Sequence, residues 1–476
     1  MITPHATDTI LRSLCAQASV WLLILVGWCA SAHAEAFRIL DQSAAATGQG
    51  TAFAAQADEP SAIHFNPAAM TQLPGIQVSM GTLLVGGTID FTPTTGPMVQ
   101  GDFGSAIANP PPTSLYITAN LGDLGFSSFK KITLGMGVNS PFGNLTDYPT
   151  SSTLAQVLSS SASPILDFKP TIAYRHNDIL AVGFGFDIYT FSDLVGEGHA
   201  EFQQVAGADL VAIGLGSTGD KIELNGTDTA LGFNVSLLWT PLRNAQGKPI
   251  ANIAFVYRSQ VGLDLEGEFI NQTTGATLDA KATLDLPQII TTGLAVWPIR
   301  NMQREWKVEF DFDYADWTSF KNLDITLSNG QVILKPRNWL PAYILMLGSE
   351  YKLLNPVQLP FWEVAFRGGY VFSKSPVPET TFKPDVPDSN YSALSIGFGL
   401  LCTDRGMFLG FIRCGHDGTT FLGPTAIGID LAYQAILYQS RGILANDDPL
   451  GRVNGVWDTI IHVGAINLRT NFELTR

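Results

Sequence analysis

Apolar and polar residues alternate along most of this chain in segments of about ten residues. Residues 305–314 show the pattern most clearly, because four bulky apolar side chains alternate there with four charged ones. The apolar set is Trp306, Val308, Phe310 and Phe312, and the charged set is Lys307, Glu309, Asp311 and Asp313. Successive side chains of a strand point to opposite faces, so a period of two predicts a strand with one apolar and one polar face.

About 14 segments of this kind follow one another, an even number, as bacterial membrane barrels have. The predicted strands are 76–89, 114–121, 131–140, 168–175, 179–190, 229–240, 249–260, 288–297, 303–314, 341–353, 362–372, 391–401, 424–435 and 457–471. The pattern therefore predicts an all-β chain.

The connections between these segments alternate in length. The odd-numbered connections are long, and short even-numbered ones occur at 176–178, 241–248, 298–302 and 354–361. An antiparallel barrel with both termini in the periplasm has this alternation, since its periplasmic turns are short and its extracellular loops long. One even connection, 402–423, is long, so it is either a periplasmic insertion or a hairpin that the pattern does not reveal.

The amino-acid composition indicates that these strands belong to a membrane protein. Charged residues make up 14% of the chain and the mean hydropathy is +0.17, whereas soluble proteins carry about 25% charged residues. Outside the N-terminus, the chain has no uncharged apolar run of the roughly 18 residues that suggest a transmembrane helix. We therefore expect a transmembrane antiparallel β-barrel with lipid outside and a polar lumen.

Charge and histidine content argue against two other classes of function. The net charge is −15, whereas a nucleic-acid-binding protein needs a basic face. Past the N-terminal segment the histidines are His64, His176, His199, His416 and His462. None has a serine and an acid in an obvious triad arrangement, so we predict no catalytic residues, no metal site, no cofactor and no enzyme.

The N-terminus has the pattern of a secretory signal peptide. Arg12 precedes an apolar core at 20–28, and Ala32-His33-Ala34 is a small-x-small cleavage site. The alternative, a single anchoring helix, is disfavoured because the core is too short to span a bilayer. We expect residues 1–34 to be removed and the mature protein to begin at Glu35.

Export would place the remaining cysteines, Cys402 and Cys414, in an oxidising compartment. A local disulfide within the 402–423 connection is the favoured interpretation. The alternative is a pair of unpaired thiols.

Residues 35–75 differ from the rest of the chain because they show no period of two. They are rich in Ala, Gly and Gln but carry too many apolar residues for a disordered tail. These residues are Phe37, Ile39, Leu40, Phe53, Ile63, Phe65 and Met70. We predict that 35–75 is a plug in the lumen and that 76–476 forms the barrel.

Several short motifs resemble one family of outer-membrane proteins. Within the plug these are Gly48-Gln49-Gly50-Thr51-Ala52-Phe53 and Asn66-Pro67-Ala68-Ala69-Met70. Others follow in order along the chain, at 140–143, 316–320, 367–370, 376–378, 384–385 and 430–433. Together they resemble the transport proteins for long-chain fatty acids and toluene-like hydrocarbons, the FadL/TodX type.

The resemblance implies a bacterial outer-membrane location and passive inward transport of a hydrophobic small molecule. Substrate would land on apolar loops, enter a barrel pocket, pass the plug, called a hatch in this family, and leave laterally into the bilayer. It also implies a monomer, with lipid and lipopolysaccharide as its surroundings. The rival interpretation is a non-transporting adhesin or structural barrel, which predicts polar loops and no apolar plug.

Three groups of residues are candidate sites. Asn66, Pro67, Ala68 and Phe53 are the candidate hatch or gate, although the Asn-Pro turn could simply end the plug. Leu154, Val157 and Leu158 have helical spacing and form either a landing groove or a short helix packed on a neighbouring loop. Arg367 is a candidate counter-charge for a substrate carboxylate.

Overall fold

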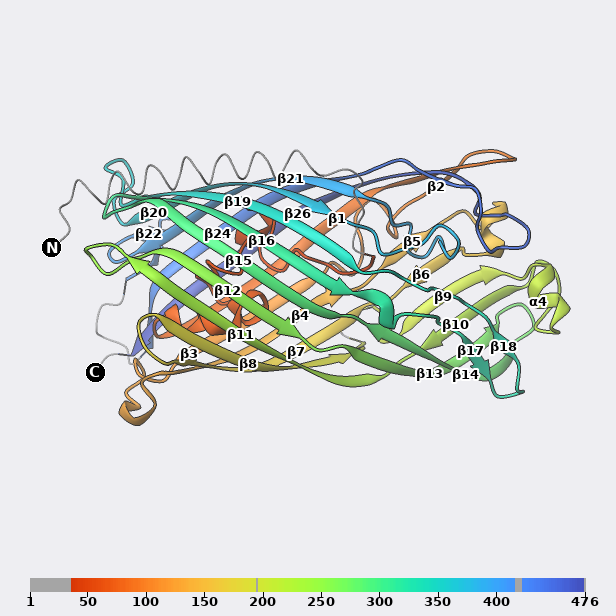
Figure 1. Ribbon diagram of the computed structural model, residues 1–476, viewed down its shortest axis with the longest axis horizontal. Helices are drawn as coiled ribbons and strands as arrows, with labels where there is room; N and C mark the ends of the chain where they lie inside the picture. Colours follow the sequence, from red (N-terminus) through yellow and green to blue (C-terminus); the bar gives the residue numbers. More distant parts are fainter. Residues whose placement is uncertain (1–35, 194–195, 416–421, 475–476) are drawn as a thin grey trace.

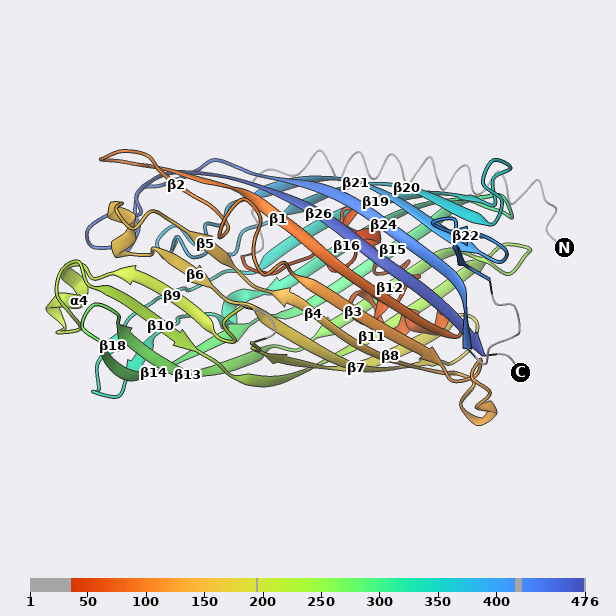
Figure 2. The same ribbon diagram turned by 180° about the vertical axis from the view of Figure 1, so that it is seen from behind.

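Fourteen antiparallel strands close into a barrel (Figures 1 and 2). The computed structural model describes residues 36–193, 196–415 and 422–474, so the predicted signal peptide and its cleavage site lie outside the described residues. The main sheet has 16 strands, of which β2 (Val99–Gly101) and β25 (Arg441–Ile443) are short additions at its two ends. The barrel closes where β1 pairs with β26, from Ile76↔Phe472 to Pro93↔Gly455.

All fourteen predicted strands are confirmed. In barrel order they are β1 (Ile76–Pro93), β3 (Thr113–Asn120), β4 (Ile132–Phe142), β7 (Ile165–Arg175), β8 (Leu180–Thr190), β11 (Thr229–Arg243), β12 (Pro249–Arg258), β15 (Gln288–Arg300), β16 (Arg304–Asp316), β19 (Ala342–Leu354), β20 (Trp362–Ser373), β21 (Tyr391–Thr403), β24 (Leu422–Tyr438) and β26 (Gly455–Leu474).

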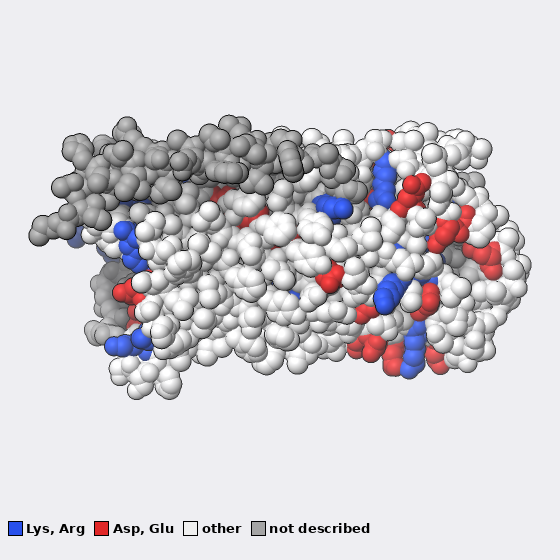
Figure 3. Space-filling model, viewed as in Figure 1, with Lys and Arg blue, Asp and Glu red and all other residues white. Residues whose placement is uncertain are grey.

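The two faces of each strand divide as the alternation predicts. On β16, Phe310 points outward and is 39% exposed, whereas Glu309 and Asp311 point into the lumen and are at most 1% exposed. Much of the visible side of the barrel is uncharged, and charged side chains gather toward its two ends (Figure 3). Such an apolar band is the surface that a bilayer requires. Among the described residues, no helix has the length and apolar character needed to cross a membrane.

The two ends of the barrel differ. One end carries short turns, and the other carries long connections that fold into a second sheet (Figure 1). By the usual asymmetry of outer-membrane barrels, the short turns are periplasmic and the second sheet is extracellular.

The extracellular sheet is a feature that the sequence interpretation missed. It has eight strands, which are β5 (Leu145–Asp147), β6 (Ser160–Ala162), β9 (Ala200–Val205), β10 (Lys221–Gly226), β13 (Val261–Asn271), β14 (Ala276–Leu286), β17 (Ile325–Leu327) and β18 (Val332–Ile333). The alternation predicts only a long connection between the strands 249–260 and 288–297, but β13 and β14, each of eleven residues, form a hairpin there. Its apolar positions alternate as in the barrel, so the signal was present.

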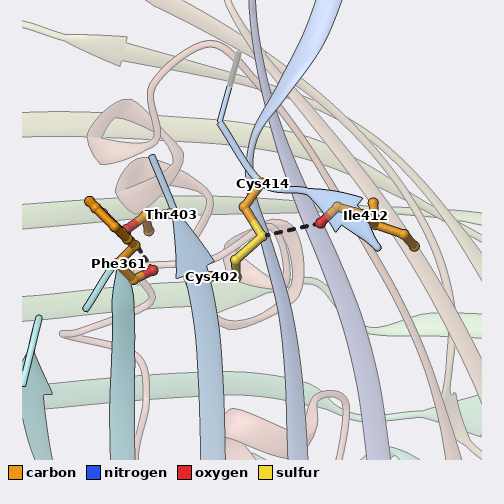
Figure 4. Close-up of a disulfide and its surroundings, with 5 residues drawn as sticks. All are labelled: Phe361, Cys402, Thr403, Ile412 and Cys414. Atoms are coloured by element: carbon orange, nitrogen blue, oxygen red, sulfur yellow. Dashed lines mark hydrogen bonds between the residues drawn. A yellow bond between two sulfur atoms is a disulfide. The ribbon is translucent and has the colours of Figure 1, made fainter. Parts of the chain in front are cut away.

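The connection 402–423 is a periplasmic insertion and not a missed barrel hairpin. Strands β21 and β24 pair directly, from Tyr391↔Tyr438 to Thr403↔Ala426, so no barrel strand lies between them. The insertion contains a small hairpin, β22 (Met407–Phe408) and β23 (Ile412–Arg413). A disulfide joins Cys402 to Cys414, with their Cα atoms 5.7 Å apart (Figure 4). Residues 416–421 lie outside the described part of the chain.

Residues 36–75, which we call the hatch, lie inside the barrel (Figure 1). Three short helical turns shape the hatch, namely α2 (Ala44–Thr47), α3 (Ala62–Phe65) and η1 (Pro67–Gln72). Small residues let it approach the wall closely. A Cβ atom added at Gly369 of β20 would lie 2.1 Å from the carbonyl carbon of Gln49, so glycine is required at this contact.

Candidate functional site

Two carboxylates of β16 hold the hatch to the barrel wall. The backbone N–H groups of Phe53 and Ala54 each donate to Oδ2 of Asp311 at 2.8 Å. Those of Ala55 and Gln56 donate to Oε1 of Glu309, at 2.6 and 3.2 Å. Four consecutive backbone donors of the hatch are thus satisfied by wall carboxylates, and hydrogen bonds to charged acceptors are stronger than neutral ones.

Ion pairs add to this attachment. Arg38 pairs with Asp313 at 2.7 Å, and Lys352 of β19 pairs with Asp58 of the hatch at 2.8 Å. The charged face of β16 that the alternation predicted is therefore an anchor for the hatch, in addition to being a polar lumen lining.

The candidate gate residues Asn66, Pro67 and Ala68 lie against the barrel wall at β11, three strands from β16 in the barrel order. The side chain of Asn66 accepts from the N–H of Ala68 at 3.1 Å, which caps η1, and donates to the carbonyl of Ala54 at 2.9 Å. The N–H of Ala68 also donates to Ser236 Oγ of β11 at 2.9 Å. The Asn-Pro segment thus begins the turn η1 and also contacts the wall. Its role as a gate stays a prediction.

The fourth candidate, Phe53, lies within the hatch itself. Its ring is fully buried and meets the ring of Phe65 edge-on, with centroids 5.4 Å apart. The carbonyl group of the next residue, Ala54, accepts a hydrogen bond from the Asn66 side chain. The segments around Phe53 and Asn66 are therefore linked within the hatch.

A cavity of about 540 Å³ lies between the N-terminal part of the hatch and the extracellular loops. Its walls come from the hatch, from the barrel strands β1, β4, β21, β24 and β26, and from several loops. They include Phe37, Ile39, Leu40, Leu83, Val85, Phe103, Phe142, Ile436, Ile461 and Val463. The volume lies within the range of small-molecule pockets, roughly 300–1,000 Å³.

A second cavity of about 110 Å³ lies beneath the extracellular sheet and shares part of its lining with the first. The shared residues are Phe37, Asn144, Ser163, Glu201, Asp385 and Val386. Its other walls include Phe202, Leu224, Leu265 and Leu284 of the sheet. Two adjoining, largely apolar spaces thus lead from the loops to the hatch.

The regular β-ladder of the barrel wall is interrupted beside the large cavity, where two isolated backbone hydrogen bonds, Leu83 N–H to Pro112 and Ala108 N–H to Val85, join β1 to the segment before β3. Strand β3 begins only at Thr113, whereas its neighbours β1 and β4 continue to Pro93 and Phe142. Three successive prolines, 110–112, precede β3 and have no N–H with which to extend the ladder. Of these, Pro110 and Pro112 line the cavity, so the cavity reaches the wall where β-pairing is interrupted.

Leu154, Val157 and Leu158 lie in the loop core. Leu154 and Leu158 are fully buried and Val157 is 9% exposed, in one cluster with Phe91, Trp457 and other aromatic residues. Only Leu154 is within the helical turn η3 (Thr153–Gln156). In this conformation the three side chains pack on neighbouring loops and line neither cavity, so a landing role stays a prediction.

Arg367 is engaged with other charges. Its Nε donates to Glu350 and its Nη1 to Asp430, both at 2.7 Å, and the side chain is buried. It lines neither cavity, so its role as a counter-charge also stays a prediction, and this geometry does not favour it.

Sequence reasoning missed the polar residues that do line the large cavity, among them Arg38, Asp41 and Asp388. Arg38 and Asp41 are charged residues within the apolar first part of the hatch, so the sequence alone could have marked them as candidate site residues. Asp388 comes from the loop before β21, and its Oδ2 accepts from the N–H of Ala36 at 3.1 Å. No local pattern could reveal that contact, because the two residues are 352 positions apart.

These features define the class of protein: an outer-membrane β-barrel whose lumen is filled by a hatch beneath an apolar cavity. The chain belongs to the family of outer membrane protein transport proteins (OMPP1/FadL/TodX), whose model matches residues 24–407. The resemblance noted from the motifs is thereby confirmed, as is the outer-membrane location.

Individual relatives agree with this assignment. The chain is 24% identical over 430 residues to a 47 kDa outer membrane protein of Pasteurella multocida, covering 83% of this chain and 88% of the relative. It is also 24% identical over 413 residues to an outer membrane protein of Neisseria meningitidis serogroup B, covering 77% and 83% of the two chains.

Solved structures share the fold. A Pseudomonas aeruginosa FadL homologue superposes with a TM-score of 0.71 at 15% identity, over 92% of this chain and all of that one (100%). The toluene transporter TodX of P. putida has a TM-score of 0.58 at 16% identity, over 87% of this chain and 95% of that one.

Proposed function

We propose that this protein passively carries hydrophobic small molecules inward across the bacterial outer membrane. The observation that carries the proposal is the cavity of about 540 Å³ above the hatch, with its mostly apolar walls. Transfer of a hydrocarbon from water into such walls is favourable by about 25 cal/mol per Å² of apolar surface. A molecule that is scarcely soluble in water would therefore collect there.

The route begins at the extracellular sheet, where the smaller cavity adjoins the larger one. From the larger cavity, two ways lead on. One is past the hatch, with Asn66, Pro67, Ala68 and Phe53 as the gate. The other is sideways into the bilayer at the wall interruption before Thr113. Lateral exit suits a hydrophobic cargo because it avoids water, and movement down a gradient needs no energy source.

The structural neighbours support a hydrophobic cargo. They include a toluene transporter and a monoaromatic hydrocarbon channel, at TM-scores of 0.58 and 0.57. Identity to both is 16% or less, so the choice between a fatty acid and a hydrocarbon rests on experiment.

The test is uptake by cells of a deletion strain that carry the wild-type protein or a cavity variant. Val85 lines the cavity on β1, whereas its neighbour Leu84 faces outward and is 40% exposed. Val85→Trp should obstruct part of the cavity and reduce uptake of radiolabelled oleate or toluene toward the level of the deletion strain. Leu84→Trp is the matched control, with the same added residue on the lipid face, and should retain uptake.

Two outcomes would contradict the proposal. One is equal uptake by the two tryptophan variants, which would mean that the cavity is not on the route. The other is uptake that does not depend on the protein for either compound although the barrel is folded in the outer membrane. That second outcome would favour a non-transporting adhesin or structural barrel.

A further inference from the structure

The disulfide attaches the periplasmic insertion to the outer face of the barrel. On β21, Cys402 lies directly opposite Trp362 of β20 and Ile427 of β24. Residues that are opposite one another in antiparallel strands share a face of the sheet, as do residues an even number of positions apart along a strand. The same face carries side chains that are 37–51% exposed toward lipid, namely Phe366, Phe398 and Leu431. Cys402 therefore points outward, and its bond to Cys414 holds the insertion on that side (Figure 4).

The insertion packs on this outer face. The ring of Phe408, in the hairpin of β22 and β23, stacks on the ring of Trp362 with the centroids 6.1 Å apart. Phe408 and the two cysteines are at most 8% exposed and form one apolar cluster. Trp362, Ile427 and Ile429 pack against this cluster, and all three belong to the lipid-facing side of the wall. The described part of the insertion thus lies beside the apolar band of the barrel at its periplasmic end.

Bulky apolar side chains are exposed on the insertion. Leu409 and Phe411, at the tip of the hairpin, are 70% and 71% exposed. The N–H of Thr403 donates to the carbonyl of Phe361 at 2.8 Å, which joins the insertion to the neighbouring periplasmic turn (Figure 4). The exposed apolar residues of these two segments, which we call the apolar foot, are Val357, Leu359, Phe361, Met407, Leu409, Phe411 and Ile412. Apolar side chains gathered on a surface mark a site of interaction with a lipid or a protein.

The charge of the insertion favours lipid as the partner. Residues 403–415 include Arg405 and Arg413, both exposed, and one acidic residue, Asp404. This segment therefore carries an excess of positive charge, whereas the whole chain has a net charge of −15. An arginine at the edge of an apolar surface keeps its guanidinium group among polar headgroups while its stem contacts hydrocarbon, and phospholipid phosphates are anionic. Apolar residues with flanking arginines have the chemistry of a membrane interface.

We propose that the apolar foot enters the periplasmic leaflet of the outer membrane, with Arg405 and Arg413 at the level of the phospholipid phosphates. The wall on which the insertion packs already faces lipid, so the insertion extends an existing lipid contact toward the periplasm. The disulfide holds the hairpin in the position from which the foot reaches the leaflet. The insertion thereby fixes the depth of the barrel in the bilayer. This inference concerns how the barrel is held in the membrane and does not depend on what it carries.

Photo-crosslinking identifies what lies against the apolar foot. The photoreactive amino acid p-benzoylphenylalanine is incorporated in place of Phe411 in the full-length protein, and isolated outer membranes are illuminated. Mass spectrometry of the peptide around this position then identifies the crosslinked molecule. Phe366 is the matched lipid-facing reference, because it too is an exposed phenylalanine, and Gln246 is an exposed polar residue of another periplasmic turn. We expect phospholipid adducts at Phe411 with a yield similar to that at Phe366, and a loss of these adducts at Gln246.

A second labelled position, Leu409, keeps the test decisive if the change at Phe411 prevents folding. A crosslink to a second copy of this chain, or to another protein, would overturn the proposal in favour of a protein interface. The absence of phospholipid adducts at both positions, with adducts present at Phe366, would overturn it by placing the apolar foot in the aqueous periplasm. Neither result would contradict hydrophobic uptake, which is measured separately.

Discussion

Removing the carboxylate of Asp311 should loosen the hatch without unfolding the barrel. In Asp311→Ala the backbone N–H groups of Phe53 and Ala54 lose the acceptor that each now contacts at 2.8 Å. Leaving a buried donor unsatisfied costs about 1–3 kcal/mol, so two donors cost about 2–6 kcal/mol. At 1.36 kcal/mol per tenfold change, local opening should become about 30-fold to 10⁴-fold more frequent.

The milder change Asp311→Asn keeps a neutral acceptor. A hydrogen bond to a charged group is worth about 1 kcal/mol more than a neutral one, so two bonds lose about 2 kcal/mol. Opening should then rise about 30-fold. Asp316→Asn is the matched control, because Asp316 lies on the same strand but accepts from Gln288 and Thr318 and not from the hatch.

Hydrogen exchange of the amides in residues 53–56 measures this opening directly, under conditions where the exchange rate reports the opening equilibrium. Amides in β16 and β19 should keep their protection. The contrary result is an exchange rate of residues 53–56 that changes less than threefold in Asp311→Ala while the barrel stays folded. It would refute the claim that wall carboxylates hold the hatch.

Three further predictions follow from single contacts. Gly369→Ala should displace the hatch, because its Cβ would lie 2.1 Å from a hatch carbonyl carbon, whereas Gly368→Ala meets only a carbonyl oxygen at 3.9 Å and should be tolerated; limited proteolysis of the hatch would distinguish the two. Replacing both Cys402 and Cys414 by Ser should destabilise the periplasmic insertion by up to about 3 kcal/mol, from lost loop closure, and increase its proteolysis with unchanged uptake. Burial raises the pKa of Asp388 to about 7, so the folded loop binds more protons than the unfolded loop. Protection of the loop amides against hydrogen exchange should therefore fall as the pH rises from about 4 to 7. A pH profile of protection that is equally steep in Asp388→Asn would contradict this.

The barrel could be predicted from sequence because lipid and lumen act on alternate residues of every strand. The alternation within each strand therefore indicates both environments from local sequence alone, as in residues 305–314. The hairpin of β13 and β14 carries a similar pattern at 261–286. The sequence analysis did not predict this hairpin, because an even number of barrel strands with alternating long and short connections accounts for the chain without it.

The site could be predicted only in outline. The apolar residues of the hatch predict that it lies in the lumen. They do not predict its hydrogen bonds to Asp311 and Glu309, because the donors are backbone N–H groups, such as that of Phe53, which every residue except proline has. The cavity is lined by the hatch, five barrel strands and several loops. Contacts such as that of Ala36 with Asp388 span 352 positions. Leu154 and Leu158 have the spacing of an exposed amphipathic turn, yet the aromatic residues of the loops bury them completely.

The most direct test of hydrophobic uptake through the cavity is to locate a hydrophobic ligand in it. Crystals of the protein soaked with 4-bromotoluene or 1-bromododecane would reveal bromine by its anomalous scattering. The account predicts bromine density between the hatch and the loops, within the walls formed by Phe37, Val85 and Ile461. Bromine found only on the lipid-facing side of the barrel, with ordered water filling the cavity, would contradict it.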